Sequence, residues 1–221
     1  MKSVSVKAGA VLFGLLLLLG SGVVASADYV AYNLPTGTMG NQVWTGSLGM
    51  DFTTTQSIII TSIGSFDNDG VGTFTGGSIT AAIYYASGPL AGTQVAGSQV
   101  AFNTGTTYTL VGASVFQAIT PITLSAGGTY AIVAWGYNTN DQNWNSGYYS
   151  PSSLIMNDGG GLITFGSSYY SDAAGVYPTT DDTHVYGAGT FQYTAIPIPA
   201  ALWLFGPGLL GLAALRRRLK D

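Results

Sequence analysis

The hydrophobic and polar positions of the chain divide it into three parts. One apolar run covers residues 8–19, and a second, uncharged one covers residues 195–215. Between them, short apolar stretches alternate with polar residues, and none repeats convincingly with the period of about 3.6 residues that is typical of an amphipathic helix. The pattern therefore predicts a β-rich domain over residues 28–194, flanked by two hydrophobic end segments.

The middle part predicts a series of short strands. Residues 57–63 (SIIITSI) and 79–85 (ITAAIYY) are rich in Ile and Tyr, which favour strands. Turn sequences such as NDG at 68–70 and AGG at 126–128 separate the strands. Further strands are expected at 95–102, 108–111, 114–119, 122–124, 129–135 and 184–193, with weaker ones at 154–156 and 162–165. Short strands at this spacing predict an all-β fold, an antiparallel β-sandwich of jelly-roll type.

One predicted hairpin has a broad resemblance to other proteins. Residues 121–138 (PITLSAGGTYAIVAWGYN) place a Gly-rich turn between two apolar stretches. The segment is similar to one found in many uncharacterised β-sandwich ectodomains of exported bacterial proteins. This resemblance implies a fold and no activity.

The N-terminal part has the order of a secretory signal. Lys2 and Lys7 precede the apolar run, and the small residues Ala25 and Ala27 form an A-x-A site after it. This order is typical of a cleavable signal peptide. The alternative is an uncleaved signal anchor, for which the apolar run is short. We therefore expect signal peptidase to cleave after Ala27, so that the mature protein starts at Asp28 outside the cytoplasmic membrane.

The C-terminal apolar run is long enough to cross a membrane. As a helix, its 21 residues would span roughly 31 Å, close to the ~30 Å hydrocarbon core of a bilayer. Arg216, Arg217 and Arg218 follow it and should remain cytoplasmic under the positive-inside rule. The chain is then anchored in the inner membrane with its C-terminus in the cytoplasm. A plain membrane anchor is one interpretation of this segment.

A more specific interpretation comes from the order of residues within the run. A Pro-x-Pro-Ala motif comes first, a Gly-Pro-Gly interruption lies at 206–208, and the three arginines end the series. This order, over about residues 196–218, resembles the PEP-CTERM sorting signals of Gram-negative bacteria, and most closely their VPLPA-type variant. The motif residues are Pro197, Ile198, Pro199 and Ala200.

The resemblance implies both a processing enzyme and a destination. An exosortase would recognise the motif and release or transfer the protein to the cell surface or extracellular matrix. It also implies a structural or adhesive role, without catalysis, linked to exopolysaccharide or biofilm. Ile196 and Ile198 stand where the variant usually has Val and Leu, and the Glu of the main PEP form is missing. A dedicated exosortase subtype is therefore expected.

The charges of the middle part exclude several functions. Between Asp28 and Thr194 there is no Lys, Arg or Glu, and all acidic residues except Asp221 lie in this range. Such a domain cannot neutralise phosphates, which excludes nucleic acid as a partner. A catalytic triad would have to use His184, the one histidine, with Asp181 or Asp182 beside it. We interpret His184 as a partly solvated residue at a strand start, and expect no enzyme activity and no salt bridge between side chains.

Two clusters could bind a ligand. Asp67 and Asp69 offer hard oxygen ligands that Ca²⁺ prefers, although such clusters are also common as hairpin turns; residues 138–141 (NTND) are a similar cluster. No other cofactor is expected, and zinc is improbable with one His and no Cys. The second cluster combines aromatic rings with amides within residues 135–149, as sugar sites do. Its candidate glycan-binding residues are Asn143, Trp144, Tyr148 and Tyr149.

The glycan hypothesis has a simple alternative. The aromatic residues of 135–149 could belong to the core or merely cover a sheet. The two interpretations differ in whether Trp144, Tyr148 and Tyr149 form one exposed face. A carbohydrate-binding module is therefore the alternative to a purely structural role.

The sorting signal generates a prediction about processing. Mature protein from the native host should begin at Asp28 and lack residues 203–221, because exosortase recognises the motif at 197–200. Intact-mass spectrometry of the secreted or surface fraction measures both ends. A chain that still ends at Asp221 would leave only the plain-anchor interpretation.

Overall fold

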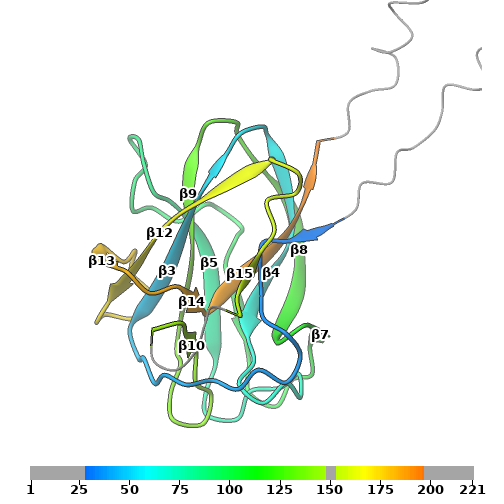
Figure 1. Ribbon diagram of the computed structural model, residues 1–221, viewed down its shortest axis with the longest axis vertical. Coiled ribbons are helices and arrows are strands. Elements are labelled where there is room, and N and C mark those ends of the chain that lie inside the picture. Colours follow the sequence, from blue (N-terminus) through cyan, green and yellow to red (C-terminus); the bar gives the residue numbers. More distant parts are fainter. Residues whose placement is uncertain (1–27, 148–152, 197–221) are drawn as a thin grey trace, which may run out of the picture. The chain divides into compact units, whose positions relative to one another are not determined.

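The computed structural model describes residues 28–147 and 153–196 (Figure 1). Within these ranges the fold is all-β and contains no helix. It accordingly offers no helix long and apolar enough to cross a membrane. The predicted signal peptide, Tyr148, Tyr149 and the predicted sorting motif lie outside the described residues.

Two antiparallel sheets make up the domain. The first contains, in spatial order, β1 (Tyr29–Val30), β15 (Gly189–Ala195), β4 (Ile58–Phe66), β8 (Ser114–Leu124) and β7 (Thr109–Val111). The second contains β13 (Thr180–Asp182), β12 (Ile163–Ser171), β3 (Ser47–Thr54), β9 (Thr129–Trp135), β5 (Ile79–Tyr85) and β6 (Val100–Phe102). Two short pairs complete the fold: β10 (Trp144–Asn145) with β14 (Tyr186–Gly187), and β11 (Ile155–Met156) with β2 (Tyr32–Asn33).

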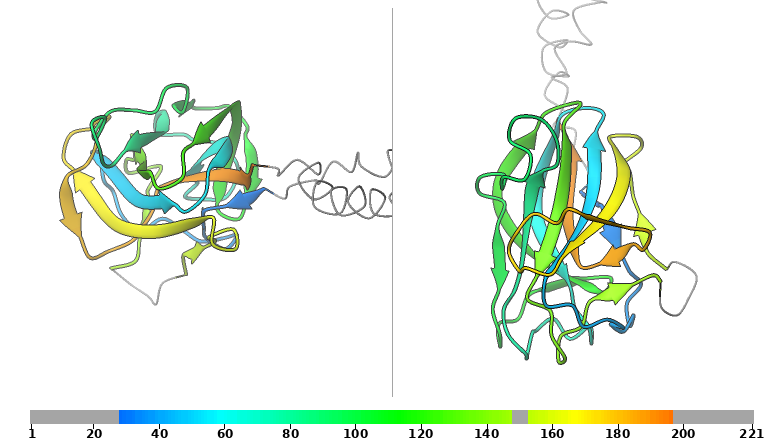
Figure 2. Two further views of the ribbon diagram at one scale, coloured as in Figure 1. Left: turned by 90° about the horizontal axis from the view of Figure 1, so that it is seen from above. Right: turned by 90° about the vertical axis from the view of Figure 1, so that its left-hand side faces the viewer.

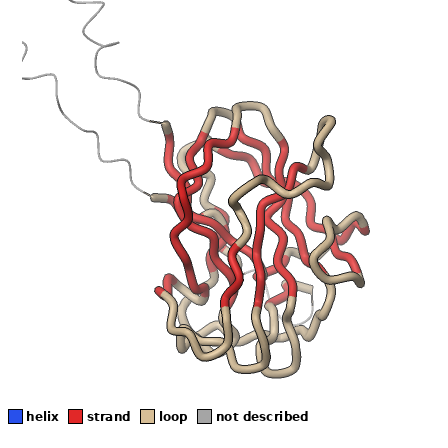
Figure 3. The backbone as a smooth tube through the Cα atoms, turned by 180° about the vertical axis from the view of Figure 1, so that it is seen from behind, coloured by secondary structure: helices blue, strands red, loops and turns tan. Residues whose placement is uncertain are grey.

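The sheets curl around a shared interior, consistent with a β-sandwich (Figure 2). Strands β3 and β4 are consecutive in sequence but lie in different sheets, where β3 pairs with β9 and β4 pairs with β8. The strands run alongside one another with loops at both ends of the domain (Figure 3). The predicted all-β, antiparallel class is therefore confirmed.

Apolar side chains from both sheets form the core. On β3, Leu48, Met50 and Phe52 are buried at every second position, as the period of a strand requires. The ring of Phe52 lies 4.6 Å from that of Phe191 on β15, centroid to centroid, and so joins the two sheets. Burying one such side chain contributes roughly 1.5–3 kcal/mol, which makes these contacts the main stabilising term.

Several predicted strands have the bounds that the sequence indicates, and one central strand was missed. Strands β5 and β9 coincide with the predicted residues 79–85 and 129–135. The stretches 114–119 and 122–124 form one strand, β8, whose pairing with β4 becomes irregular opposite Thr61. Pro121, which has no N–H to donate to a neighbouring strand, lies at this irregularity. Strand β3 was not predicted, although it pairs with both β12 and β9.

The loop between β12 and β13 (residues 172–179) covers the outer face of the second sheet. Pro178 packs on Gly49 of β3, where a Cβ atom would lie only 2.7 Å from the proline Cγ. The Tyr84 hydroxyl donates to the Gly175 carbonyl at 3.2 Å, and the rings of Tyr84 and Tyr177 are 6.1 Å apart. This loop therefore buries a second, smaller apolar cluster. Its buried members are Ala82, Tyr84, Ala131 and Val133.

Asp51 lies on the same outer face of β3, opposite Ala131 of β9. Its Oδ1 atom is buried and has no hydrogen-bond partner among the described residues. Burial raises the pKa of this carboxyl to about 6. Burial, and then the negative charge of Asp51, raise the pKa of Tyr177 to about 12. The ionised carboxylate is thus a cost to the folded state at neutral pH.

We expect the full-length chain to be more stable at about pH 5.5 than at about pH 8. Because the pKa of Asp51 is raised in the folded state, its contribution is fully present below the usual aspartate value of about 3.9 and is lost as the pH rises through about 6. Asp51→Asn should therefore raise the melting temperature at the higher pH and reduce the difference between the two. Calorimetry at both pH values measures this.

Asp158→Asn is the matched control, because it removes an exposed carboxylate that accepts a local bond from the Gly160 N–H, as an asparagine also can. This variant should keep the pH dependence of the parent chain. If Asp51→Asn lowered the melting temperature by the same amount at both pH values, the ionised carboxylate would not be what destabilises the fold. The result would show that the shape of this side chain matters and its charge does not.

Candidate ligand-binding pocket

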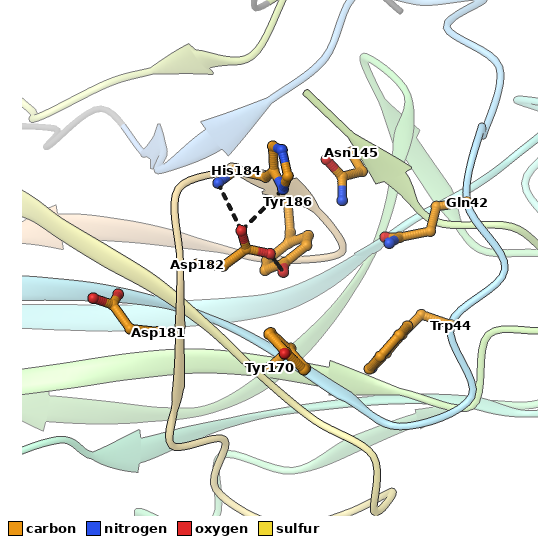
Figure 4. Close-up of a pocket in the computed structure, with 8 residues that line it drawn as sticks. All are labelled: Gln42, Trp44, Asn145, Tyr170, Asp181, Asp182, His184 and Tyr186. Atoms are coloured by element: carbon orange, nitrogen blue, oxygen red, sulfur yellow. Dashed lines mark hydrogen bonds and ion pairs between the residues drawn. The ribbon is translucent and has the colours of Figure 1, made fainter. Parts of the chain in front are cut away.

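A pocket of about 330 Å³ opens where β10, β13 and β14 come together with the loop before β3 (Figure 4). This volume is at the lower end of the range of roughly 300–1,000 Å³ typical of ligand sites. It suits a small ligand or one part of a polymer. The lining residues are Gln42, Trp44, Asn145, Tyr170, Asp181, Asp182, His184 and Tyr186.

Paired amides hold one wall of the pocket. Asn41 Nδ2 donates to the Asn145 carbonyl at 2.9 Å, and the Asn145 N–H donates to Asn41 Oδ1 at 2.8 Å. Beside them, Asn143 Nδ2 donates to Gln42 Oε1 at 2.7 Å. These bonds fix the loop before β3 against β10. The Gln42 side chain can consequently meet a ligand without a large loss of conformational freedom, whereas the Asn145 side chain is buried and its Oδ1 accepts from the Gly147 N–H at 2.8 Å.

The second wall is aromatic. Trp44 Nε1 donates to the Ser171 carbonyl at 3.1 Å, and the rings of Trp44 and Tyr170 meet edge to face with their centroids 5.2 Å apart. Both side chains are half-buried. Each ring is therefore held in place and still partly accessible from the pocket (Figure 4).

The third wall contains the histidine. His184 Nδ1 lies 2.9 Å from Asp182 Oδ1, and the Tyr186 hydroxyl donates to Asp182 Oδ2. The expectation that no ion pair could form in this domain is wrong at this place, since protonated His184 pairs with Asp182. Gly147 makes room for the ring, because a Cβ atom there would lie 1.9 Å from His184 Cδ2. The sequence put Asp182 and His184 near each other, but only folding orients them.

The electrostatics of the pocket are acidic. Desolvation opposes ionisation of Asp182, but the hydrogen bonds from Tyr186 and from the His184 N–H, together with the His184 charge, outweigh it. The pKa of Asp182 therefore lies below its usual range. Asp181 is exposed on β13 and lies apart from the others at one side of the pocket (Figure 4). No Lys or Arg occurs between residues 28 and 194, so no permanent positive charge offsets these carboxylates.

The predicted glycan-binding residues do not form the expected surface. Trp144 is 6% exposed and belongs to the core, and Asn143 is fully buried and supports Gln42. Trp144 cannot serve as a platform for a sugar, so this part of the hypothesis is corrected. The physical reason is that β10 pairs with β14 and thereby carries Trp144 inward. The aromatic side chains of the pocket are Trp44, Tyr170 and Tyr186, and none of them is among the glycan-binding residues that the sequence predicts.

The predicted calcium ligands lie in a turn that is closed by hydrogen bonds. Asp67 is buried and its Oδ2 accepts from the Gly72 N–H at 2.6 Å, while Asp69 is exposed and its Oδ1 accepts from the Val71 N–H at 3.3 Å. Burial, and to a smaller extent the neighbouring Asp69 carboxyl, raise the pKa of Asp67 to about 6. Among the described residues, no group of three or more acidic, His or Cys side chains could hold a metal ion. Calcium binding at Asp67 and Asp69 stays a prediction.

Asp141, in the similar cluster at 138–141, also serves a loop. Its carboxylate accepts from the Thr75 N–H at 3.2 Å and from the Gly76 N–H at 2.5 Å. It therefore joins the loop after β9 to the loop before β5, and it is 5% exposed.

Comparison with known proteins does not indicate a function, so function is inferred from the chemistry of the pocket. No protein-family model matches the chain, and no curated protein matches its sequence. Function must then come from the site, because a fold alone does not determine it. The site offers aromatic rings, amides, carboxylates and one imidazole within one small volume.

The His184 contact generates a prediction that needs no ligand. In samples at about pH 8, the proton of the neutral ring should reside on Nδ1, because Nδ1 faces the Asp182 carboxylate. The chain has one histidine, so ring nitrogen signals of ¹⁵N-labelled full-length protein come from His184 alone. Asp182→Ala should shift the proton toward Nε2, whereas Asp181→Ala should not. An Nε2–H ring in the parent chain would contradict the assignment.

Proposed function

We propose that this chain is an exported, exosortase-processed surface protein whose domain binds polysaccharide through the pocket lined by Trp44 and Tyr170. The observation that carries the proposal is the combination of two fixed aromatic rings with the half-buried amide of Gln42, which Asn143 holds in place. Apolar ring faces accept the C–H faces of sugars, and amides hydrogen-bond to their hydroxyl groups. Ligand sites in general combine such apolar walls with a few placed polar groups.

The ends of the domain suit a protein that is processed on both sides. Strand β1 pairs with β15, with Tyr29 opposite Tyr193. The segment after the signal peptide and the segment before the sorting motif therefore leave from the same edge of one sheet. We further propose that the β3–β9 and β4–β8 pairings make the sandwich a jelly roll, and that the processed domain is held at the cell surface or in the matrix of a Gram-negative bacterium.

We propose binding rather than catalysis because of the way His184 is held. Its Nδ1 edge faces Asp182, and its Nε2 edge lies over Gly147, where a Cβ atom would be 2.1 Å from Nε2. Glycine at position 147 leaves space next to that nitrogen, but none of the described residues that line the pocket is a Ser, Thr or Cys that could act as a nucleophile beside it. The side chains around His184 therefore favour binding over nucleophilic catalysis.

Replacing the aromatic wall tests the proposal. Trp44→Ala should weaken binding of the full-length chain to the host's own exopolysaccharide by about tenfold or more, as expected for loss of a central aromatic contact. Affinity electrophoresis in gels containing the polysaccharide measures the change in retention. Thermal melting of the same samples reports whether the variant is folded.

Trp135→Ala is the matched control. Trp135 is also half-buried, but it lies on the outer face of the second sheet beside Gly175 and outside the pocket. This variant should be retained as strongly as the parent chain. Equal retention of Trp44→Ala and the parent would overturn the pocket assignment, and no retention of the parent would overturn polysaccharide binding itself.

A further inference from the structure

The Gln42 amide is a polar group of the pocket that is held in place and still has hydrogens to donate. Asn143 Nδ2 donates to Gln42 Oε1 at 2.7 Å, so the oxygen end of this amide is engaged and its orientation is fixed. Asn143 is itself fully buried, which restricts the movement of this support. Among the described residues, none accepts a hydrogen bond from Gln42 Nε2. The half-buried amide therefore presents N–H donors to a ligand.

The carboxylates of the pocket do not offer a matching acceptor beside the rings. Asp182 Oδ1 accepts from the His184 N–H at 3.1 Å, and its Oδ2 accepts from the Tyr186 hydroxyl. Asp181 precedes Asp182 on β13, and neighbouring side chains of a strand point to opposite faces. Figure 4 accordingly shows Asp181 apart from the aromatic wall. The polar group that the pocket presents next to its rings is thus a donor.

This donor lies beside an apolar surface. Gln42 and Trp44 are two residues apart in the loop before β3, and both line the pocket. In Figure 4 the Gln42 amide points toward the space above the Trp44 ring. Because Trp44 Nε1 already donates to the Ser171 carbonyl, the ring offers a ligand mainly apolar surface. A chemical group that fits this arrangement carries a hydrogen-bond acceptor and a small apolar part close together.

We infer that the pocket prefers N-acetylated amino-sugar units to sugar units that carry a hydroxyl group at the same position. This inference rests on the proposed polysaccharide binding and adds the chemical class of the sugar. The carbonyl of the acetamido group accepts from Gln42 Nε2, and its methyl group packs on the Trp44 ring. Neither contact needs a charge, which suits a domain that has no Lys or Arg between residues 28 and 194 to bind an acidic sugar.

The test compares two neutral oligomers that differ at one position of each sugar unit. Trimers of N-acetylglucosamine and of glucose with the same glycosidic linkage are titrated calorimetrically into the full-length chain. The N-acetylated trimer should bind about tenfold more tightly, which is what one amide hydrogen bond and one buried methyl group contribute together. Since neither trimer is charged, the difference should not depend on the salt concentration.

Gln42→Glu removes the donor and keeps the shape of the side chain. One oxygen of the carboxylate can still accept from Asn143 Nδ2, so the melting temperature should stay close to that of the parent chain. The preference for the N-acetylated trimer should fall to about threefold or less, because the ligand carbonyl then faces an acceptor instead of an N–H donor. An undiminished preference in this variant would overturn the inference.

Gln117→Glu is the matched control. It makes the same chemical change at an exposed position of β8, outside the pocket. This variant should keep the full preference for the N-acetylated trimer. A loss as large as that of Gln42→Glu would show that added negative charge lowers the preference wherever it lies, and would also overturn the inference.

The outcomes separate this inference from the proposed function. Equal affinity for the two trimers, or tighter binding of the glucose trimer, would overturn the preference and leave polysaccharide binding intact. If neither trimer binds while the host's exopolysaccharide still retains the parent chain, the sugar class is wrong and the proposed function stands. If the parent chain binds neither the trimers nor the exopolysaccharide, the proposed function is wrong as well. A proline-rich peptide that binds more tightly than both trimers would assign the aromatic wall to peptides and overturn the inference.

Discussion

The lack of basic side chains between residues 28 and 194 is the constraint on which the polar part of this structure depends. A buried carboxylate normally needs a cation or several hydrogen bonds. Here Asp67 receives the N–H of Gly72, and Asp141 receives the N–H groups of Thr75 and Gly76. Backbone donors thus replace the lysines and arginines of an ordinary domain. Since both ends of such a bond belong to loops, the carboxylates also determine how the loops between strands are held.

The lack of basic side chains also makes the contact between Asp182 and His184 important for the electrostatics of the domain. With no guanidinium or ammonium group nearby, the imidazole is the one side chain in the domain that can become a cation. It lies 2.9 Å from a carboxylate that also accepts from Tyr186. The ion pair that the described residues form, between His184 and Asp182, therefore lies in the pocket.

The sequence predicts the parts of the fold that depend on local pattern. Strands β5 and β9 are recognisable because Ile, Val and Tyr are dense within them and turn residues bound them. The same pattern does not predict strand β3, because Gly49 and Asp51 on its outer face interrupt the run of strand-forming residues. Gly49 is there for the packing of Pro178, a contact between residues far apart in sequence. Local propensity cannot reveal such a requirement.

The sequence predicts the chemistry of the candidate site but not its position in the fold. Its chemistry, aromatic rings beside amides, is visible in the composition of residues 135–149. Which tryptophan is accessible is decided by tertiary pairing: β10 carries Trp144 into the core, whereas Trp44 is held at the pocket by the Ser171 carbonyl. A hydrogen bond across such a distance in sequence leaves no local signal. Asn145 was within the predicted segment, and Gln42 and Tyr170 were outside it.

The hairpin of β12 and β13 connects the stability of the fold to the geometry of the pocket. Its loop, residues 172–179, covers the outer face of the second sheet through Pro178 and Tyr177. Its strands carry Tyr170 and the two aspartates that line the pocket. Because Tyr170 pairs with Thr180 across this hairpin, displacing the loop would also move the aromatic wall relative to the carboxylates. The small apolar cluster on the outer face therefore holds the residues of the pocket in register, although none of its buried residues lines the pocket.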